Sequence, residues 1–352
     1  AGEPFAVRLK VAREGRSRFD DAVYGAQERD YSEIEDLVLL RSEGGHPLYN
    51  LSVVVDDIEM GITDVIRGQD HLTNTHKQIL IYEALGAPVP RFAHLPLILA
   101  PNKAKLSKRK HGEVVSLTTY RDRGFVPAAF RNYLALLGWS PADEREIMTL
   151  DELVEKFSLE GIHRSNAVFN FSEADPRQWT DPKALWMNAE YIRTMPPEEL
   201  LPMVRAEFEA AGLWRPEYES GAREWFERTV VLIRERFMTL RDFSGQGRAY
   251  FSDEFAFDEA AVAKNLKKEP RLKELLPALA ERMETVEPFN AETSEAALRA
   301  FAEEAGVKAG LLINASRTAL TGQSVGPSMF EVYDAVGRER SALRLRNAAG
   351  LI

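Results

Sequence analysis

The sequence predicts a protein of several domains in which an α/β part is followed by an all-α part. Its 352 residues are too many for one hydrophobic core, so roughly two or three domains are expected. A strand–helix–strand pattern occurs in the first third of the chain, whereas the periodicity after about residue 113 is almost entirely helical. Since this pattern implies parallel strands, a parallel sheet is expected only in the first part.

Two strand-like segments precede the helix of this pattern. Leu51–Val55 and Ile62–Ile66 are short apolar runs separated by acidic residues. The next stretch, HLTNTHKQILIYEALG, has the apolar spacing of a helix. Thr75 followed by Gln78 fits a capping box at its start, and Gly86 is typical of a residue that follows a helix end. A helix of about three turns is therefore expected here.

Two other segments are predicted to be strands. His94–Leu99 is an apolar run that begins after Pro88 and Pro90 have interrupted the chain, and Pro4–Val11 alternates apolar and polar residues.

Ligands of open parallel sheets bind at the carboxyl ends of the strands. The residues that follow Leu99 are therefore well placed for a binding site.

The remainder of the chain is predicted to be helical. Glycine and proline punctuation predicts one helix before Gly124 and another from Pro127 to Gly138. Apolar spacing predicts further helices at Leu150–Phe157, Lys183–Tyr191, Pro197–Ala211, Ala222–Phe237 and Glu292–Ala305.

The composition is that of an ordinary globular protein with an acidic balance. The formal net charge is −10, and no run of about 18 apolar residues occurs, so no membrane-spanning helix is expected. The sequence contains no cysteine, which excludes disulfides and thiolate metal sites within it, and its six histidines show no metal-ligand spacing. No signal-peptide pattern is visible, and the cytoplasm is the simplest expected location.

One short segment opposes this acidic character. The stretch NKAKLSKRKHG, directly after the predicted strand His94–Leu99, has no acidic residue. It carries five cations, at Lys103, Lys105, Lys108, Arg109 and Lys110. A solvated surface loop is one interpretation. The other is a phosphate-binding loop, because Leu106 needs a pocket, Ser107 can bond to a phosphate oxygen, and ammonium groups stabilise the charge that develops on a triphosphate.

The segment KLSKR resembles the Lys-Met-Ser-Lys-Ser loop of class I aminoacyl-tRNA synthetases, in the form found in glutamyl-tRNA synthetases. The similarity extends from HPLYNLSVVVDDIEMGITDVIRGQDHLTNTHKQILIYEALG through PRFAHLPLIL to the loop, and it continues in RNYLALLGWS, LWMNAEYIR, RERFMTL and RTALTG. It covers nearly all of the chain. The resemblance implies a multidomain α/β plus all-α protein, with a partial Rossmann-type nucleotide fold followed by helical stem-contact and anticodon-binding domains.

This resemblance implies five segments. They are the end of an acceptor-binding insert (1–47), the second half of the Rossmann-type catalytic domain with the KLSKR loop (48–112), a stem-contact domain (113–188), and two parts of a helical anticodon-binding domain (189–265 and 266–352).

The resemblance also implies a reaction in two steps. Glutamate and ATP, accompanied by Mg²⁺, give glutamyl-adenylate and pyrophosphate, and the glutamyl group then passes to the 3′ end of tRNA-Glu. Lys105 and Lys108 would neutralise the departing pyrophosphate, while Ser107 and Arg109 would hold the loop and its phosphates.

Arg67 matches the family arginine that binds the glutamate side chain, and a guanidinium can grip a carboxylate with two parallel hydrogen bonds. An Arg67 that is instead paired with Asp64 or Asp70 is the structural alternative. Tyr49 matches the family tyrosine of the amino-acid pocket, although an isolated tyrosine in an apolar run is more often a core residue.

The ATP side of the site is expected to involve other residues near the sheet. By resemblance, Asp70 and His71 line it, the backbone near Leu97 and Ile98 flanks adenine, and Lys108 contacts the phosphates.

Four residues near the carboxyl end match anticodon-contacting positions of the family: Arg236, Arg317, Gly326 and Met329. Arginines and backbone groups suit the edges of splayed-out single-stranded bases. An arginine at position 236 favours discrimination between tRNA-Glu and tRNA-Gln. For each of these arginines the alternative is a solvated helix face. Phosphate contact is a further hypothesis for Arg338, Arg340, Arg344 and Arg346.

One family signature is missing from the sequence. Class I synthetases carry a His-Ile-Gly-His tetrad that faces the ATP phosphates, and no such tetrad occurs here. The chain is therefore expected to be the carboxyl-terminal portion of a longer synthetase, to lack full activity alone, and to act as a monomer. No zinc site is expected in these residues.

Three other interpretations were weighed. A glutaminyl-tRNA synthetase is disfavoured because its anticodon region is built of β-barrels. A tRNA-modifying glutamyl transferase is disfavoured because it lacks an anticodon domain. A non-catalytic tRNA-binding fragment or subunit derived from a synthetase remains as the alternative function.

Overall fold

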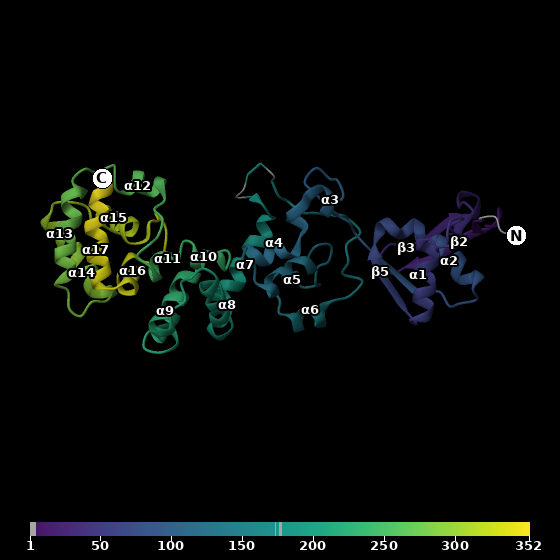
Figure 1. Cartoon of the computed structure of the whole chain (residues 1–352), viewed down its shortest axis with the longest axis horizontal. Coiled ribbons are helices and arrows are strands. Elements are labelled where there is room, and N and C mark those ends of the chain that lie inside the picture. The colour runs from purple at the N-terminus through teal and green to yellow at the C-terminus, as the bar shows by residue number, and fades with distance from the viewer. Residues whose placement is uncertain (1–4, 173, 176–177) are drawn as a thin grey trace. The chain divides into compact units, whose positions relative to one another are not determined.

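The computed structural model describes residues 5–172, 174–175 and 178–352, and it divides the chain into two compact units. The first unit comprises Ala1–Ser116 and Arg131–Pro182, and the second comprises Leu117–Phe130 and Lys183–Ile352 (Figure 1). Pro4, the first residue of the predicted strand Pro4–Val11, lies outside the described residues, as do the first four residues of the predicted 1–47 segment. The finer division into five segments stays a prediction.

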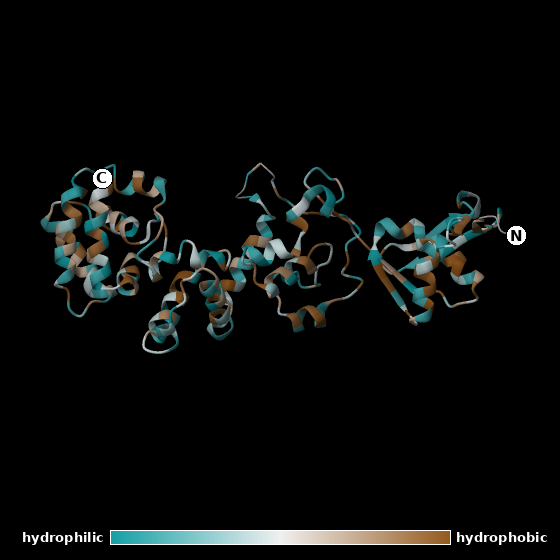
Figure 2. Ribbon diagram, viewed as in Figure 1, coloured by the Kyte–Doolittle hydropathy of each residue, from teal (hydrophilic) through white to brown (hydrophobic). Residues whose placement is uncertain are grey.

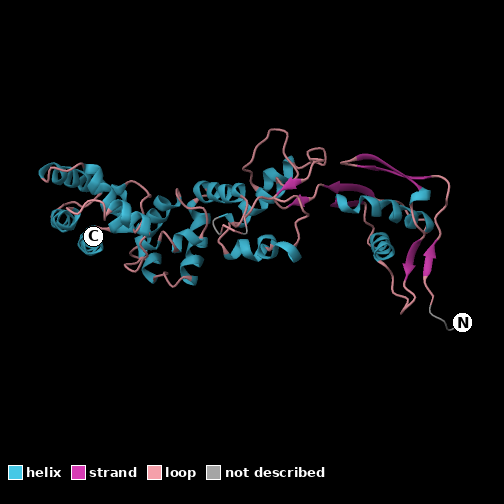
Figure 3. Cartoon of the chain, turned by 90° about the horizontal axis from the view of Figure 1, so that it is seen from above, coloured by secondary structure: helices cyan, strands magenta, loops and turns pink. Residues whose placement is uncertain are grey.

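A four-stranded sheet organises the first unit. Its strand order is β3 (Gly25–Asp30), β2 (Arg16–Asp21), β6 (Arg91–Leu95), β5 (Asp64–Gly68). Strands β5 and β6 are parallel and are joined by helix α2 (Leu72–Ala84), which confirms the predicted crossover unit. Strand β2 also runs parallel to β6, and β2 and β3 form an antiparallel hairpin. All strands of the described residues belong to this unit (magenta in Figure 3).

The predicted strand Leu51–Val55 is wrong, because these residues lie in helix α1 (Tyr49–Glu59). Three consecutive valines look strand-like, since β-branched side chains suit a pleated surface. The spacing of Leu51, Val54 and Ile58 nevertheless forms one helical stripe, and all three pack in the same core cluster. Val54 is completely buried there.

The predicted start of α2 is wrong as well. The helix begins at Leu72, so Thr75 lies inside its first turns, and the Thr75 hydroxyl is 3.1 Å from the carbonyl of His71 instead of capping the helix. The predicted end is confirmed, because the helix stops at Ala84 and Gly86 adopts a φ of +66° that glycine tolerates best.

The predicted strand His94–Leu99 divides into two. Strand β6 ends at Leu95, and β7 (Ile98–Leu99) pairs with β8 (Ala167–Val168) in a separate two-stranded sheet. Pro96 lies between them and has no N–H for a ladder hydrogen bond, which explains the interruption.

The predicted strand at the amino end is confirmed in shorter form. Strand β1 (Val7–Leu9) pairs antiparallel with β4 (Leu37–Leu40).

The rest of the chain is helical, as predicted. Two short helices belong to the first unit, α3 (Lys108–His111) and α6 (Leu150–Lys156), and the chain passes between the units within α5 (Pro127–Ala135) and at α7 (Pro182–Thr194). The second unit contains α4 (Leu117–Asp122), α8 (Pro197–Ala210), α9 (Arg223–Arg234), α10 (Arg241–Ser244), α11 (Arg248–Phe251), α12 (Glu259–Asn265), α13 (Leu272–Glu284), α14 (Ala291–Glu304), α15 (Ala309–Thr321), α16 (Met329–Val336) and α17 (Arg338–Ala348).

A continuous hydrophobic core joins the helices of the second unit. Phe208, Leu276, Leu312 and Tyr333 are among its fully buried members, and the Tyr333 hydroxyl lies 2.8 Å from the hydroxyl of Ser316. Along these helices hydrophobic residues alternate with hydrophilic ones (Figure 2), as expected for helices that bury one face.

Candidate functional site

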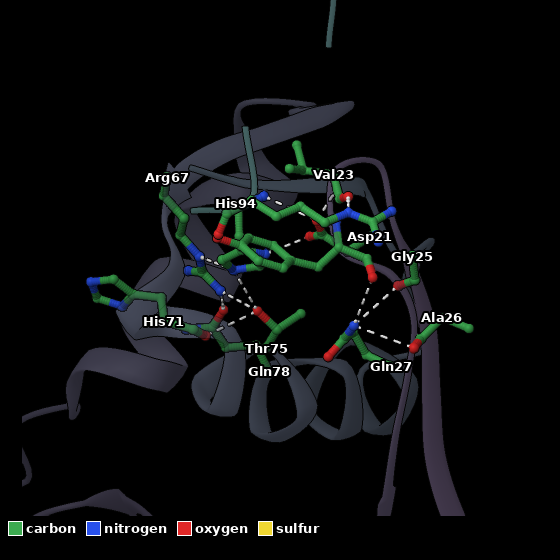
Figure 4. A network of polar contacts seen from close by, with 12 residues as sticks. Asp21, Val23, Gly25, Ala26, Gln27, Arg67, His71, Thr75, Gln78 and His94 are labelled. Carbon is green, nitrogen blue, oxygen red and sulfur yellow. Dashed lines mark hydrogen bonds and ion pairs between the residues drawn. The ribbon is translucent and has the colours of Figure 1, made fainter. Parts of the chain in front are cut away.

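Arg67 occupies the end of strand β5, where its side chain meets helix α2 and strand β6. Its Nε donates to Nε2 of His94 at 3.3 Å, and its Nη2 lies 2.7 Å from Oγ1 of Thr75 and 2.7 Å from Oε1 of Gln78 (Figure 4). These contacts engage three of the five N–H groups of the guanidinium. Every one of these acceptors is electrically neutral, provided that His94 is uncharged.

The charge of Arg67 is not compensated by a direct ion pair. Asp64 lies 2.6 Å from Arg91 and Asp70 lies 2.5 Å from Lys105, and within the described residues neither carboxylate pairs with Arg67. The alternative in which Arg67 is held by Asp64 or Asp70 is therefore wrong. Burial lowers the pKa of Arg67, an effect opposed by the Tyr49 hydroxyl and by the charge of Asp57. A half-buried cation in this setting attracts an anion.

Two further predicted pocket residues lie beside Arg67. Tyr49 is the first residue of α1, its side chain is half exposed, and its hydroxyl is 3.5 Å from Nδ1 of His71. The Tyr49 hydroxyl also acts to raise the pKa of Arg67, which indicates that it lies close to the guanidinium. The structure thus brings Tyr49, Arg67 and His71 together, and the alternative in which Tyr49 is a core residue is wrong.

The predicted two-bond grip of Arg67 is constrained by its neighbours. Because Nε and Nη2 already meet protein acceptors, the two N–H groups of Nη1 are those left for a ligand. A grip by both terminal nitrogens would require a carboxylate to replace Thr75 or Gln78 at Nη2.

The base of the cationic loop is attached to strand β7 and, through Lys105, to the segment that follows strand β5. The Leu106 amide donates to the carbonyl of Ile98 at 3.0 Å, and Lys105 pairs with Leu99 across a β-bridge. Lys105 Nζ reaches Oδ2 of Asp70 at 2.5 Å, and this hydrogen bond lowers the pKa of Asp70. Asp70 lies only three residues after Arg67, so the loop is connected to the segment that carries the buried cation.

The tip of the loop is exposed and positively charged. Lys108 and Arg109 lie in α3, both are exposed, and neither side chain forms an ion pair within the described part of the chain. The amide of Ser107 donates to Nδ1 of His111 at 3.1 Å, which closes this turn. Sequence reasoning missed His111.

The backbone groups predicted to flank adenine already have partners. The Leu97 amide donates to Oδ1 of Asn166 at 2.9 Å, the Leu97 carbonyl accepts from Ala167 at 3.0 Å, and the Ile98 carbonyl accepts from Leu106. Contact of Leu97 and Ile98 with adenine stays a prediction, and it would use the second lone pairs of these carbonyls or the side chains.

The sequence reasoning missed most of the residues around Arg67. The sequence pattern predicts only a helix cap at Thr75 and Gln78, and it predicts no role for Asp21 or His94. Each of these four side chains is buried. The one available signal was a histidine within an otherwise apolar strand, since buried polar groups require partners.

In the second unit, Arg236, Arg317 and Gly326 come together. Arg317 Nη1 donates to the carbonyl of Pro327 at 2.6 Å, and a Cβ added to Gly326 would lie 3.0 Å from the same nitrogen. Burial lowers the pKa of Arg317, and the nearby charge of Arg236 lowers it further. Arg236 is exposed, and within the described residues neither arginine has a carboxylate partner. Two neighbouring cations without a counter-ion are typical of an anion-binding surface.

Met329 differs from these three residues, because its side chain is buried in the core of the second unit. An anticodon contact of Met329 stays a prediction, and it would have to use the backbone.

The phosphate hypothesis for the four terminal arginines is not supported, because each has a carboxylate partner within the chain. These pairs are Arg338 with Glu287, Arg340 and Arg344 with Asp253, and Arg346 with Glu284.

Metal-binding clusters and membrane-spanning helices are both absent from the described residues. No group of three or more histidine, aspartate or glutamate side chains in them is arranged to hold a metal ion. Among the same residues, no helix has the length and apolar character needed to cross a membrane.

Comparisons with known proteins cover both units. Residues 1–176 match the family model "tRNA synthetases class I (E and Q), catalytic domain", and residues 198–349 match the model "Anticodon binding domain". The chain is 48% identical over 351 residues to the glutamate–tRNA ligase of Desulfotalea psychrophila, covering 100% of this chain and 71% of the relative. It is 47% identical to glutamate–tRNA ligase 2 of Koribacter versatilis, covering 99% of this chain and 69% of the relative.

A solved structure agrees with these relatives. The glutamate tRNA ligase of Elizabethkingia meningosepticum, in complex with its amino acid, superposes with a TM-score of 0.81 at 29% identity and covers 99% of this chain and 68% of that chain. Family models, relatives and fold therefore agree, and the chain belongs to the glutamate–tRNA ligases, which are class I aminoacyl-tRNA synthetases.

Proposed function

We propose that this chain carries the glutamate-recognition, phosphate-binding and tRNA-binding elements of a reaction that joins glutamate to tRNA-Glu at the expense of ATP. The observation that carries the proposal is Arg67, a half-buried cation whose hydrogen-bond acceptors among the described residues are His94, Thr75 and Gln78, with no carboxylate in direct contact. Such a cation lacks a counter-ion of its own, and the γ-carboxylate of glutamate would supply one.

In the proposed complex Arg67 binds the glutamate side chain and Tyr49 supports it. Among the described residues no carboxylate forms an ion pair with Arg67, so a ligand carboxylate gains a charge-assisted hydrogen bond without displacing one. The side chain of glutamine is neutral, so its hydrogen bond to Arg67 would be weaker. This difference is the physical basis for preferring the acid over the amide.

The cationic loop would act on the phosphates of ATP, which enters with Mg²⁺ as its substrate complex. Lys108 and Arg109 are exposed and unpaired with acids, which supports a role in neutralising the pyrophosphate as it departs. Lys105 is held by Asp70, so Lys105 and Asp70 would orient the loop, while the Ser107 hydroxyl would meet a phosphate oxygen. His71 would border the nucleotide beside Tyr49.

The second unit would bind tRNA-Glu. Arg236, Arg317 and the open backbone at Gly326 would read anticodon bases, and Arg236 would contribute to the choice between tRNA-Glu and tRNA-Gln. We place the reaction in the cytoplasm, with the protein acting as a monomer.

The test is ATP–pyrophosphate exchange by a full-length glutamate–tRNA ligase that contains this chain, with glutamate and tRNA-Glu present, combined with calorimetric titration of glutamate. Lys108→Ala should lower exchange roughly 100-fold, because it removes a charge that acts in the transition state, while the glutamate Kd changes less than about threefold. Lys308→Ala, which removes an exposed lysine at the start of α15, is the control and should change neither quantity.

Equal losses of exchange and of glutamate affinity in Lys108→Ala would contradict the role of the loop. If the chain bound tRNA but did not bind glutamate, the alternative of a non-catalytic tRNA-binding protein would be favoured instead.

A further inference from the structure

Behind Arg67 lies a buried hydrogen bond between Asp21 and His94, two residues to which the proposed reaction assigns no role. Oδ2 of Asp21 is 2.6 Å from Nδ1 of His94, and both side chains are completely inaccessible to solvent. The other carboxylate oxygen, Oδ1, accepts from the amides of Val23 at 3.0 Å, Tyr24 at 2.9 Å and His94 at 3.3 Å (Figure 4). Asp21 thus ends strand β2, holds the following turn and contacts strand β6 at the same time.

The hydrogen-bond partners assign a charge to each group. Burial alone would raise the pKa of Asp21, but the hydrogen bonds from His94 and from the amides of Tyr24 and Val23 outweigh it and lower the pKa. Burial lowers the pKa of His94, although Asp21 opposes this effect. At neutral pH the pair is therefore a carboxylate and a neutral imidazole.

A neutral imidazole has one N–H, and its position follows from its neighbours. Nδ1 faces the Asp21 carboxylate, which can only accept, so Nδ1 carries the hydrogen. Nε2 is then an acceptor, and it lies 3.3 Å from the Nε donor of Arg67 and 3.1 Å from the hydroxyl of Thr75. With the opposite tautomer, two donors would face each other between His94 and Arg67.

We infer that Asp21 and His94 are positioning residues for glutamate recognition, in which the carboxylate fixes the tautomer of His94 and His94 fixes the rotation of the Arg67 guanidinium. The inference rests on the proposed role of Arg67. His94 holds Nε, and Thr75 and Gln78 hold Nη2, so the orientation of the guanidinium plane is fixed and Nη1 is left for a ligand.

The neutral ring also separates the two charges. If a carboxylate touched Arg67 directly, a ligand carboxylate would have to compete with it. The imidazole lets Asp21 orient Arg67 while leaving the cation without a contacting counter-ion. Orientation and an uncompensated charge are both needed for a side chain that is to bind glutamate and reject glutamine.

Two substitutions of His94 separate positioning from packing. Glutamine can place an oxygen near the position of Nε2 and so retain the acceptor for Arg67, whereas asparagine can place its amide near Nδ1 and retain only the link to Asp21. We expect His94→Gln to weaken glutamate binding less than about threefold and His94→Asn to weaken it roughly tenfold or more. A role in packing alone predicts similar losses for both.

The matched control is His76, another buried histidine of the same unit. It lies on α2, its Nδ1 is 2.9 Å from the hydroxyl of Ser17, and it does not hydrogen-bond to Arg67. His76→Asn should leave glutamate affinity unchanged. If His94→Asn bound glutamate as well as His94→Gln, or if His76→Asn cost as much as His94→Asn, the positioning role would be overturned.

A measurement without ligand decides the tautomer separately. In the ¹⁵N spectrum of histidine-labelled chain at pH 7, the signals of His94, identified by their loss in His94→Gln, should show a protonated Nδ1 and an unprotonated Nε2. Asp21→Asn should exchange the two, because an amide N–H can then face the ring. A protonated Nε2 in the unchanged chain would overturn the inference. If the chain did not bind glutamate, the proposed function would fail. The spectrum would still test whether Asp21 fixes the tautomer of His94.

Discussion

At the scale of single residues, the arginines of the chain differ in what surrounds their charge. Arg346 meets both oxygens of Glu284 at 2.7 and 2.6 Å. Arg344 is almost completely buried and combines Asp253 with backbone carbonyls. The guanidinium groups of Arg67 and Arg317, by contrast, donate hydrogen bonds to neutral acceptors. Arginines that lack a carboxylate partner are therefore the better candidates for ligand binding.

This contrast predicts different effects of two substitutions on tRNA binding. Arg236→Ala removes an exposed arginine that has no acidic partner in the described residues, so we expect tRNA-Glu to bind roughly tenfold more weakly. Arg346→Ala removes an arginine whose charge is already balanced by Glu284, and the tRNA affinity should stay within about twofold. Filter binding at a fixed low salt concentration measures both. The interpretation would be wrong if Arg346→Ala lost more affinity than Arg236→Ala.

At the scale of elements, the sequence predicted the helices of the second unit well because glycine, proline and apolar spacing are local signals. It failed at Leu51–Val55, where β-branched residues lie on a helix whose packing overrides their local preference.

The Asp21–His94 contact could not be predicted for a different reason. These residues are 73 positions apart, and only the parallel pairing of β2 with β6 brings them together. The family motif identifies Arg67 and Tyr49. It does not identify Thr75 and Gln78, which hydrogen-bond to Arg67.

The packing of α1 gives a prediction at this scale. Val54→Ala removes two methyl groups from a completely buried position, which should destabilise the surrounding structure by about 2 kcal/mol. Hydrogen exchange of the whole chain should show faster exchange of amides in α1 and α2 and no change in α13–α17. Val154→Ala, at a valine that is 72% exposed in α6, is the control and should have almost no effect. Unchanged exchange in α1 after Val54→Ala would contradict the packing described here.

At the scale of the whole molecule, an acidic chain offers, among its described residues, cations without an acidic partner at each of its predicted sites. The net charge is −10, so most of the surface repels RNA and triphosphates and favours their approach only where cations lack partners. Each compact unit contains such a place. The first unit has Arg67 and the loop with Lys108 and Arg109, and the second has Arg236 with Arg317. This arrangement agrees with a protein that handles an acidic amino acid, a nucleotide and an RNA.

The most direct test of the account is a calorimetric titration of the chain with L-glutamate and with L-glutamine. We expect glutamate to bind at least roughly tenfold more tightly, because only its side chain supplies the counter-ion that Arg67 lacks. Arg67→Lys should lose most of this preference, while Arg91→Lys, which changes an arginine paired with Asp64 in the same sheet, should keep it. Equal affinity for the two amino acids, or an undiminished preference in Arg67→Lys, would contradict the central claim.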